Sequence, residues 1–230
     1  MKATPAIPDH FPVGEFVPDH FAHRGFGGEF EMEVEWIRKH MSPGAKRIVD
    51  VGCGNGSLMS AIGLQRVIGL DLQLLGLAYT RQRIPTARLV AGCATALPFL
   101  DNSLDVLTVQ HVVEHLSNPA GAIREWYRTL TQGGLLLLVT PNTAFRDPSI
   151  FDDPSHVHLF KRDELASVVV QAGFEILHLC SIGLPWFRSH NGIPGGWRLR
   201  RSVLRGTTAL SSIPGLRWRG QSLCCGARKP

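Results

Sequence analysis

Three glycines at alternate positions, Gly52, Gly54 and Gly56, directly follow a short apolar run. Glycine lets the backbone form turns and approach a bound group more closely than any residue with a Cβ. A helical segment begins just after the glycines, and the next apolar run ends in Asp71. Many parallel α/β proteins bind a nucleoside at a glycine turn between a strand and a helix. The ribose hydroxyls of the nucleoside then bind an acid at the end of the next strand. This stretch therefore predicts a nucleoside-binding turn.

The spacing of the glycines distinguishes between nucleoside cofactors. A dinucleotide site has the pattern G-x-G-x-x-G, with the third glycine three positions after the second. Here the third glycine comes two positions after the second, Ser57 stands where the dinucleotide glycine would be, and Asp50 leads the pattern. The resulting D-x-G-x-G-x-G resembles motif I of the class I S-adenosylmethionine (SAM) methyltransferases. SAM, and not NAD, is therefore the expected cofactor.

Three later segments extend this resemblance, and they occur in the order that the family has. Residues 92–116 resemble the family's turn after the third strand together with its fourth strand. Residues 124–142 resemble the helix and the fifth strand that follow, and residues 155–174 resemble a late segment of the small-molecule branch. That branch is the ubiquinone-biosynthesis-like one (methyltransferase type 11/23), and the resemblance covers roughly residues 45–184 and the last strand. The segments are GCATALPFLDNSLDVLTVQHVVEHL (92–116), REWYRTLTQGGLLLLVTPN (124–142) and SHVHLFKRDELASVVVQAGF (155–174).

Apolar runs alternate with helical segments along the chain, which predicts an α/β fold with a mostly parallel sheet. The resemblance implies a Rossmann-like sheet of seven strands in the order 3-2-1-4-5-7-6, with the last strand antiparallel and helices on both faces. We expect the pair Gly133-Gly134 to end the helix at 119–131. The expected strands are 48–51, 67–71, 88–91, 104–110, 135–140, 174–183 and 222–228, and the expected helices are 29–41, 57–64, 73–83, 119–131 and 162–172.

The length of 230 residues predicts a single domain, 1–230, with an N-terminal arm and helix at 1–44. No apolar run approaches the roughly 20 residues of a membrane span, and the N-terminus lacks the pattern of a signal peptide. The five cysteines show no C-x-x-C spacing. Reduced thiols in a cytoplasmic protein are therefore expected, rather than a disulfide framework.

Basic residues gather at the C-terminal end. Residues 188–230 contain nine Lys or Arg and no acid, which leaves 15 basic against 19 acidic residues in 1–187. The insertion at 185–220, between the last two strands, includes WRLRRSVLRGTTALSSI, which predicts a basic amphipathic helix. Two interpretations stay open for it: a lid over the acceptor, or a peripheral contact with a membrane.

The resemblance assigns roles to the residues around the glycine turn. It implies that Asp50 lies near the methionine amino group, that Asp71 binds the ribose diol and that Leu72 covers adenine. The amide of Ala94 would bind the adenine ring. Cys93 departs from the family, which usually has an acid there, and weaker cofactor binding is expected. The expected cofactor-binding set is Asp50, Gly52, Cys53, Gly54, Gly56, Asp71, Leu72, Cys93, Ala94 and Gln110.

Three histidines are the candidate catalytic residues: His111, His156 and His158. Each lies where the acceptor is expected, and a histidine can remove a proton from a hydroxyl. No metal is expected. The alternative is a metal at His111, Glu114 and His115, because some quinone-biosynthesis methyltransferases carry acids proposed to hold a metal in the equivalent turn. The same letters match the peptidase motif H-x-x-E-H, but that motif requires a continuous helix and here it follows a strand.

These features predict a SAM-dependent methyltransferase (EC 2.1.1.-) that methylates a small-molecule or lipid-linked acceptor, most plausibly at oxygen. An RNA methyltransferase is one alternative, suggested by the basic segment at 188–230, although the sequence contains no RNA-binding module. A SAM-binding protein without catalysis is the other, and the cysteine at position 93 favours it slightly. No nucleic-acid partner is expected under the leading interpretation.

Overall fold

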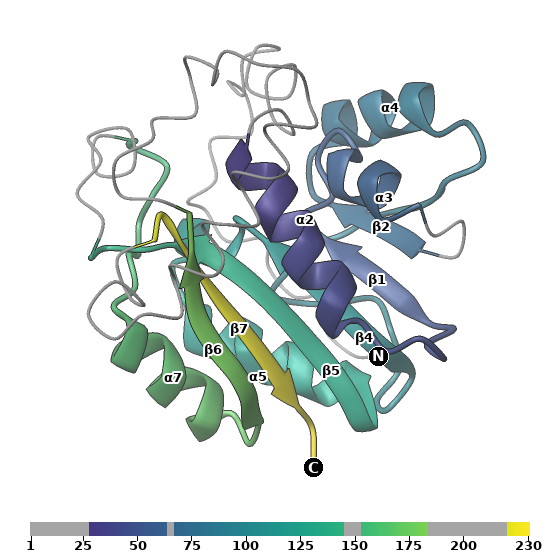
Figure 1. Cartoon of the computed structure of the whole chain (residues 1–230). Helices are drawn as coiled ribbons and strands as arrows, with labels where there is room; N and C mark the ends of the chain where they lie inside the picture. The colour runs from purple at the N-terminus through teal and green to yellow at the C-terminus, as the bar shows by residue number, and fades with distance from the viewer. Residues whose placement is uncertain (1–27, 64–66, 145–152, 184–219) are drawn as a thin grey trace.

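The computed structural model describes residues 28–63, 67–144, 153–183 and 220–230. Seven strands form one sheet in the order β3-β2-β1-β4-β5-β7-β6 (Figure 1). The first five strands pair in parallel, and β7 pairs antiparallel with both β5 and β6. The predicted strand order is confirmed. The bounds are β1 Ile48–Val51, β2 Val67–Asp71, β3 Arg88–Ala91, β4 Leu104–Gln110, β5 Leu130–Pro141, β6 Glu175–Ile182 and β7 Ser222–Arg228.

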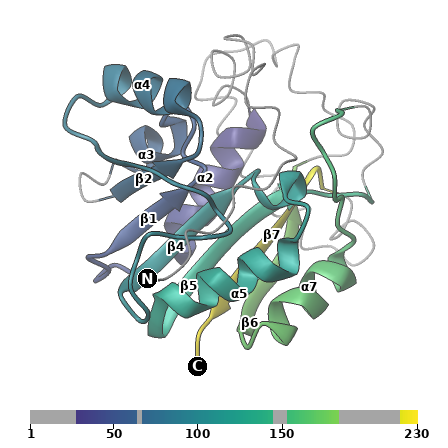
Figure 2. The same ribbon diagram turned by 180° about the vertical axis from the view of Figure 1, so that it is seen from behind.

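Helices cover both faces of the sheet, as the sequence predicted. Figure 1 shows α2 crossing the front of the sheet, and Figure 2 shows α5 and α7 on the opposite face. The side chains of α3 and one from α4 belong to the same core cluster as those of α2. The bounds are α2 Gly28–His40, α3 Ser57–Ile62, α4 Leu74–Arg83, the 3₁₀ turn η1 Val113–His115, α5 Pro119–Thr129 and α7 Arg162–Gln171.

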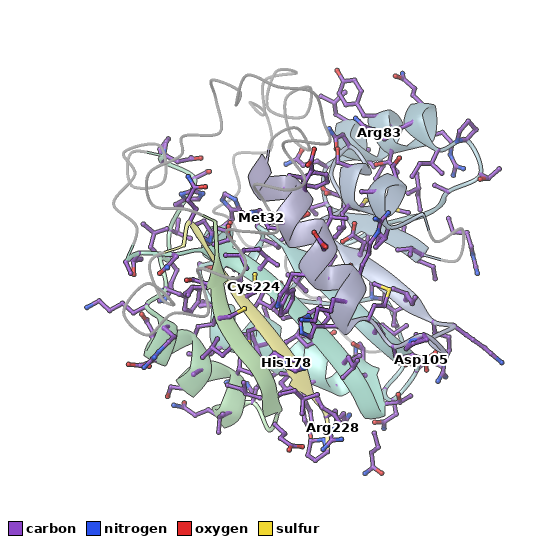
Figure 3. The ribbon with its side chains drawn as sticks, in the orientation of Figure 1. Met32, Arg83, Asp105, His178, Cys224 and Arg228 are labelled. Carbon is purple, nitrogen blue, oxygen red and sulfur yellow. The ribbon has the colours of Figure 1, made fainter. Side chains whose placement is uncertain are left out.

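Two apolar layers hold the helices against the sheet. In the layer under α2, Ile37 is fully buried, and burying such a side chain stabilises a fold by about 1.5–3 kcal/mol. Figure 3 labels Met32 on α2 and Cys224 on β7, which belong to this layer. On the other face Trp126 of α5 is fully buried. The central strands are apolar on both faces because helices cover both, as is usual for parallel sheets.

The prediction that Gly133-Gly134 end a helix is wrong. Helix α5 ends at Thr129, and β5 starts at the next residue. The backbone N–H groups of residues 102 and 103 bind the last two carbonyls of the helix, at 3.0 and 2.8 Å, so the helix stops there. Gly133 instead has a φ of 77° and donates its N–H to the carbonyl of Lys229 at 2.8 Å. The glycines therefore join the start of β5 to the end of the chain.

Most of the predicted N-terminal arm and nearly all of the basic insertion at 185–220 lie outside the described residues. Within the described residues, no helix is both long and apolar enough to cross a membrane. The carboxyl ends of β1, β2, β4 and β5 meet at one edge of the sheet, because these strands are parallel. Ligands of open parallel sheets bind at this edge.

Candidate active site

The predicted glycine turn leaves the end of β1 in a conformation that only glycine adopts easily. Gly52, Gly54 and Gly56 have φ angles of 72°, 51° and 72°. A Cβ added to Gly52 would lie 2.3 Å from Cγ2 of Val112, and one added to Gly56 would lie 2.8 Å from the Thr80 side chain. Both the backbone conformation and the available space therefore require glycine here.

Asp71 closes this turn from the end of β2. Its Oδ2 accepts the N–H of Gly54 at 2.8 Å, and its Oδ1 accepts the N–H of Gln73 at 2.7 Å. The side chain is 8% exposed. These two backbone bonds hold the carboxylate of Asp71 against the glycine turn and the segment that follows β2. The binding of a ribose diol, which the resemblance assigns to Asp71, stays a prediction.

Asp50 is a buried carboxylate with an unsatisfied oxygen. Its Oδ1 accepts the hydroxyl of Thr108 at 2.9 Å, whereas its Oδ2 has no hydrogen-bond partner in the described part of the chain. Burial raises the pKa of Asp50 to about 7, and the charge of Asp71 adds to the shift. A buried polar atom without a partner is costly. The positive amino group of SAM is therefore a fitting partner for this oxygen.

The expected adenine side is formed by the turn after β3. Gly92 donates its N–H to the carbonyl of Asp71 at 3.0 Å, which places the turn beside the end of β2. The Cys93 sulfur lies 3.0 Å from the hydroxyl of Thr95, and the carbonyl of Ala94 accepts the indole N–H of Trp126 at 2.9 Å. The acid that the family usually has is thus replaced by a thiol–hydroxyl pair.

Two further expected cofactor residues differ in what they can offer. Leu72 directly follows β2 and is half-buried, so part of its side chain is accessible beside the turn. The Cys53 side chain packs into the core under α2, and burial raises the pKa of its thiol. Only the backbone of Cys53 belongs to the turn, where its N–H binds the carbonyl of Leu70 at 3.0 Å.

A network of buried charged groups lies at the end of β4, around His111. The ring nitrogen Nε2 of His111 lies 3.0 and 3.2 Å from the two carboxylate oxygens of Glu33, on α2. The other ring nitrogen, Nδ1, lies 3.2 Å from Oε1 of Glu114, on η1. The two carboxylates are 2% and 0% exposed, while the His111 side chain is 28% exposed. His111 also has a φ of 53°, which is unusual for a residue other than glycine.

The network shifts the pKa of each member toward its charged form. Burial alone would lower the pKa of His111, but Glu33 and Glu114 outweigh it and raise that pKa well above its ordinary value. Burial alone would raise the pKa values of the two glutamates, but the charge and hydrogen bonds of His111 lower both. At neutral pH the network is therefore an imidazolium between two carboxylates.

Sequence reasoning missed Glu33, although it expected both Gln110 and His111 in the site. A usable signal was present, because Glu33 lies among apolar residues on the face of the helix that carries Phe30 and Ile37. An acid on the buried face of an amphipathic helix needs a partner. Gln110 provides one of the partners, since its Nε2 donates to Oε2 of Glu33 at 2.5 Å.

The segment that carries the other two candidate histidines is attached to η1. The carbonyl of Glu114 accepts the N–H groups of Val157 and His158, at 3.0 and 2.9 Å. The rings of His115 and His156 lie 4.9 Å apart. The structure therefore brings His156 next to the turn that follows β4, near the expected acceptor side.

His156 and His158, both candidate catalytic residues, have different partners. The Nε2 of His156 lies 3.8 Å from Oδ2 of Asp153, and its side chain is 9% exposed. The Nε2 of His158 lies 2.9 Å from Oε1 of Glu164, at the start of α7. His158 is thus attached to α7, whereas His156 lies between Asp153 and η1.

The alternative of a metal at this turn fits the described residues poorly. Among the described residues, the ligand atoms that lie within 4.8 Å of one another belong to Glu114, His115 and His156, and not to the predicted set of His111, Glu114 and His115. However, both oxygens of Glu114 already have partners: Nδ1 of His111, and the hydroxyl of Thr140 at 3.1 Å. A protonated His111 cannot donate an electron pair to a metal. No step is therefore assigned to a metal here.

The sequence of the chain is similar to those of known methyltransferases. Residues 49–138 match the model of a methyltransferase domain. The chain is 30% identical over 193 residues to a probable S-adenosylmethionine-dependent methyltransferase of Mycobacterium tuberculosis, covering 77% of this chain and 69% of that protein. It is 29% identical over 159 residues to a ubiquinone biosynthesis O-methyltransferase of Pseudomonas putida, covering 62% of this chain and 66% of that protein.

Solved structures show the same fold. A putative methyltransferase from Bacillus halodurans superimposes with a TM-score of 0.61 at 24% identity, covering 86% of this chain and 98% of that one. A SAM-dependent methyltransferase from Archaeoglobus fulgidus gives a TM-score of 0.63 at 18% identity, covering 86% and 94%. With the glycine turn and the two acids beside it, these matches identify the chain as a member of the class I SAM-dependent methyltransferases.

Proposed function

We propose that this protein transfers the methyl group of SAM to a hydroxyl of a small-molecule or lipid-linked acceptor, with His156 as the proton acceptor. The observation that carries this proposal is the position of His156, held between Asp153 and the turn that follows β4. The relative from Pseudomonas putida is a ubiquinone biosynthesis O-methyltransferase, which supports oxygen as the accepting atom.

In this proposal the residues of the chain bind, orient and deprotonate. The oxygens of Asp50 and Asp71 bind the amino group and the ribose of SAM. When bound, SAM supplies a methyl group already activated by its sulfonium. The acceptor hydroxyl gives its proton to His156 while its oxygen forms the bond to the methyl carbon. The carbon–sulfur bond breaks, and its electron pair stays on sulfur.

Asp153 supports His156 in this role. Burial alone would raise the pKa of Asp153, but the side-chain and backbone hydrogen bonds of Ser155 oppose it, and the pKa of Asp153 lies below its ordinary value. Asp153 is therefore ionised at neutral pH, and its charge stabilises the imidazolium that forms on His156. His111 is less suited to accept a proton, because each of its ring nitrogens already faces a carboxylate oxygen.

The experiment uses SAM with a labelled methyl group and matched acceptors: a catechol, a prenylated phenol, the corresponding anilines, and RNA. Label should appear on the hydroxyl acceptors. His156→Ala should lower turnover about 10²–10⁴-fold without changing SAM affinity, whereas His158→Ala should have a small effect. Label on the anilines or RNA, or unchanged turnover in His156→Ala, would contradict the proposal; labelled RNA would favour the nucleic-acid alternative.

A further inference from the structure

We propose that Glu33 is a positioning residue: together with Glu114 it holds a protonated His111, and this bridge fixes helix α2 over the carboxyl end of β4. The bridge would set the orientation of Gln110, an expected cofactor-binding residue, and of His111, which the sequence analysis expects on the acceptor side. The inference relies on the proposed function only for the location of the acceptor. We call Glu33, His111 and Glu114 the carboxylate bridge.

The contacts of Glu33 connect three elements that lie far apart in the sequence. Its Oε2 accepts the Nε2–H of Gln110, at the end of β4, at 2.5 Å. Its Oε1 accepts the hydroxyl of Ser222, at the start of β7, at 2.6 Å. Both oxygens face Nε2 of His111, in the turn after β4. Figure 1 shows α2 lying across the front of the sheet. A single buried side chain therefore joins the N-terminal helix to the edge of the sheet where ligands bind.

The geometry favours charge on His111. A neutral imidazole donates from only one ring nitrogen, whereas an imidazolium donates from both. Both nitrogens of His111 face oxygens of buried carboxylates, which act only as acceptors when ionised. Two ionised carboxylates buried without a cation would destabilise the fold strongly, because burial removes their hydration. The protonated ring is therefore the arrangement in which every facing atom has a complementary partner.

Other ionisable groups around the bridge do not remove this need. His115 acts on Glu114 from the same turn, and Cys224 of β7 lies near Glu33 with a thiol whose pKa burial raises. Thr140 of β5 donates to Glu114 at 3.1 Å. Cys224 stays neutral, and His115 binds the carbonyl of Ser155 at 2.9 Å. His111 is thus the cation that lies between the two carboxylates.

The backbone of His111 shows why such a bridge is useful. A φ of 53° in a residue other than glycine is strained and persists only where the surroundings impose it. The two carboxylates fix the ring from both sides, and the N–H of His111 binds the carbonyl of Val139 at 2.9 Å. The bridge therefore holds the residue after β4 in a conformation that it would otherwise leave.

The first test follows the ring of His111 by NMR in protein labelled at histidine, from about pH 6 to about pH 9, around the ordinary histidine pKa. His111→Gln assigns the signal. His111 should stay protonated well above the ordinary pKa in the wild type and should lose its proton at a lower pH in Glu33→Gln. Glu35→Gln, on the exposed side of the same helix, should match the wild type.

The second test measures hydrogen exchange of the α2 amides. Glu33→Gln should speed exchange in residues 30–40 about tenfold or more, while Glu35→Gln should leave it unchanged. A wild-type His111 that titrates near the ordinary value would overturn the proposal, and that measurement decides even if Glu33→Gln fails to fold. Unchanged exchange in a folded Glu33→Gln protein would also overturn it. Neither readout needs an acceptor, so both are independent of the proposed function.

Discussion

At the scale of single residues, Asp50 combines a cost in stability with a use in binding. Its pKa of about 7 in the folded chain lies above the ordinary value of 3.8, so the folded state holds this proton more tightly than the unfolded state does. The contribution of Asp50 to stability is therefore lost as pH rises from about 4 to about 7. Above that pH the carboxylate of Asp50 is ionised, and a cationic group of SAM would bind this negative charge.

Replacing Asp50 by Asn should therefore change stability and binding in opposite directions. At pH 8 the shift corresponds to about 4 kcal/mol, and an amide left without a partner offsets about 1–3 kcal/mol of it. We expect Asp50→Asn to raise the free energy of unfolding of the SAM-free protein by about 1–3 kcal/mol at pH 8, but not at pH 4.

SAM affinity of the same variant should fall about 10–100-fold, because a charge-assisted bond worth about 1.5–3 kcal/mol is lost. Denaturant titrations at both pH values and calorimetry with SAM measure the two effects. Asp163→Asn is the control, since the Asp163 side chain is 81% exposed. An Asp50→Asn protein that is less stable than the wild type at pH 8, or that binds SAM equally well, would contradict this account.

At the scale of elements, the glycine turn can be tested with substitutions that separate space from backbone strain. Gly52→Ala places a Cβ 2.3 Å from Val112 at a φ of 72°. Gly63→Ala meets nothing within 4 Å but keeps a φ of 68°, and Gly44→Ala has neither problem. Strain alone costs of order 1–3 kcal/mol. We expect the loss of stability to be largest for Gly52, intermediate for Gly63 and small for Gly44.

Only Gly52→Ala should also weaken SAM binding, because it alters the turn itself. Thermal unfolding and calorimetry on the three variants give both quantities. Equal destabilisation by Gly63→Ala and Gly52→Ala would mean that the close approach to Val112 contributes little, and unchanged SAM binding in Gly52→Ala would contradict the role of the turn.

The elements also show what the sequence could predict. Strands β1, β2, β3, β4 and β7 begin and end where the pattern predicted them, because each is an apolar run bounded by turn residues or charges. The end of α5 was not predictable in this way, because backbone groups of residues 102 and 103 end it from a distant loop. A local pattern cannot report a contact of that kind.

The candidate site likewise contains residues that a local motif predicts and residues that only packing brings together. The glycine turn and Asp71 lie within twenty residues of each other and form a local motif. Glu33 binds His111 across 78 positions of sequence, and only the packing of α2 on the sheet brings the two together. Residues whose role depends on such packing have no sequence motif, except for an acid on an otherwise apolar helix face.

At the scale of the whole molecule, charge is distributed unevenly along the chain. Residues 1–187 have a net charge of −4, whereas 188–230 contain nine basic residues and no acid. Four arginines, Arg198, Arg200, Arg201 and Arg205, occur among apolar residues within that segment. These four arginines lie outside the described residues, so a membrane role for them stays a prediction from sequence. A basic segment of this kind attracts anionic surfaces.

Replacing these four arginines by Gln should reduce binding to vesicles that contain anionic lipid. Each arginine near such a surface contributes about 1 kcal/mol, so four contribute about 4 kcal/mol, or roughly a thousandfold in partitioning. Neutral vesicles should bind both proteins weakly, and salt should weaken the wild-type binding because the attraction is electrostatic. Vesicle sedimentation measures all four combinations. Negligible binding of the wild type to anionic vesicles would exclude the membrane contact, and tight, salt-sensitive RNA binding that the variant loses would favour the RNA methyltransferase alternative instead.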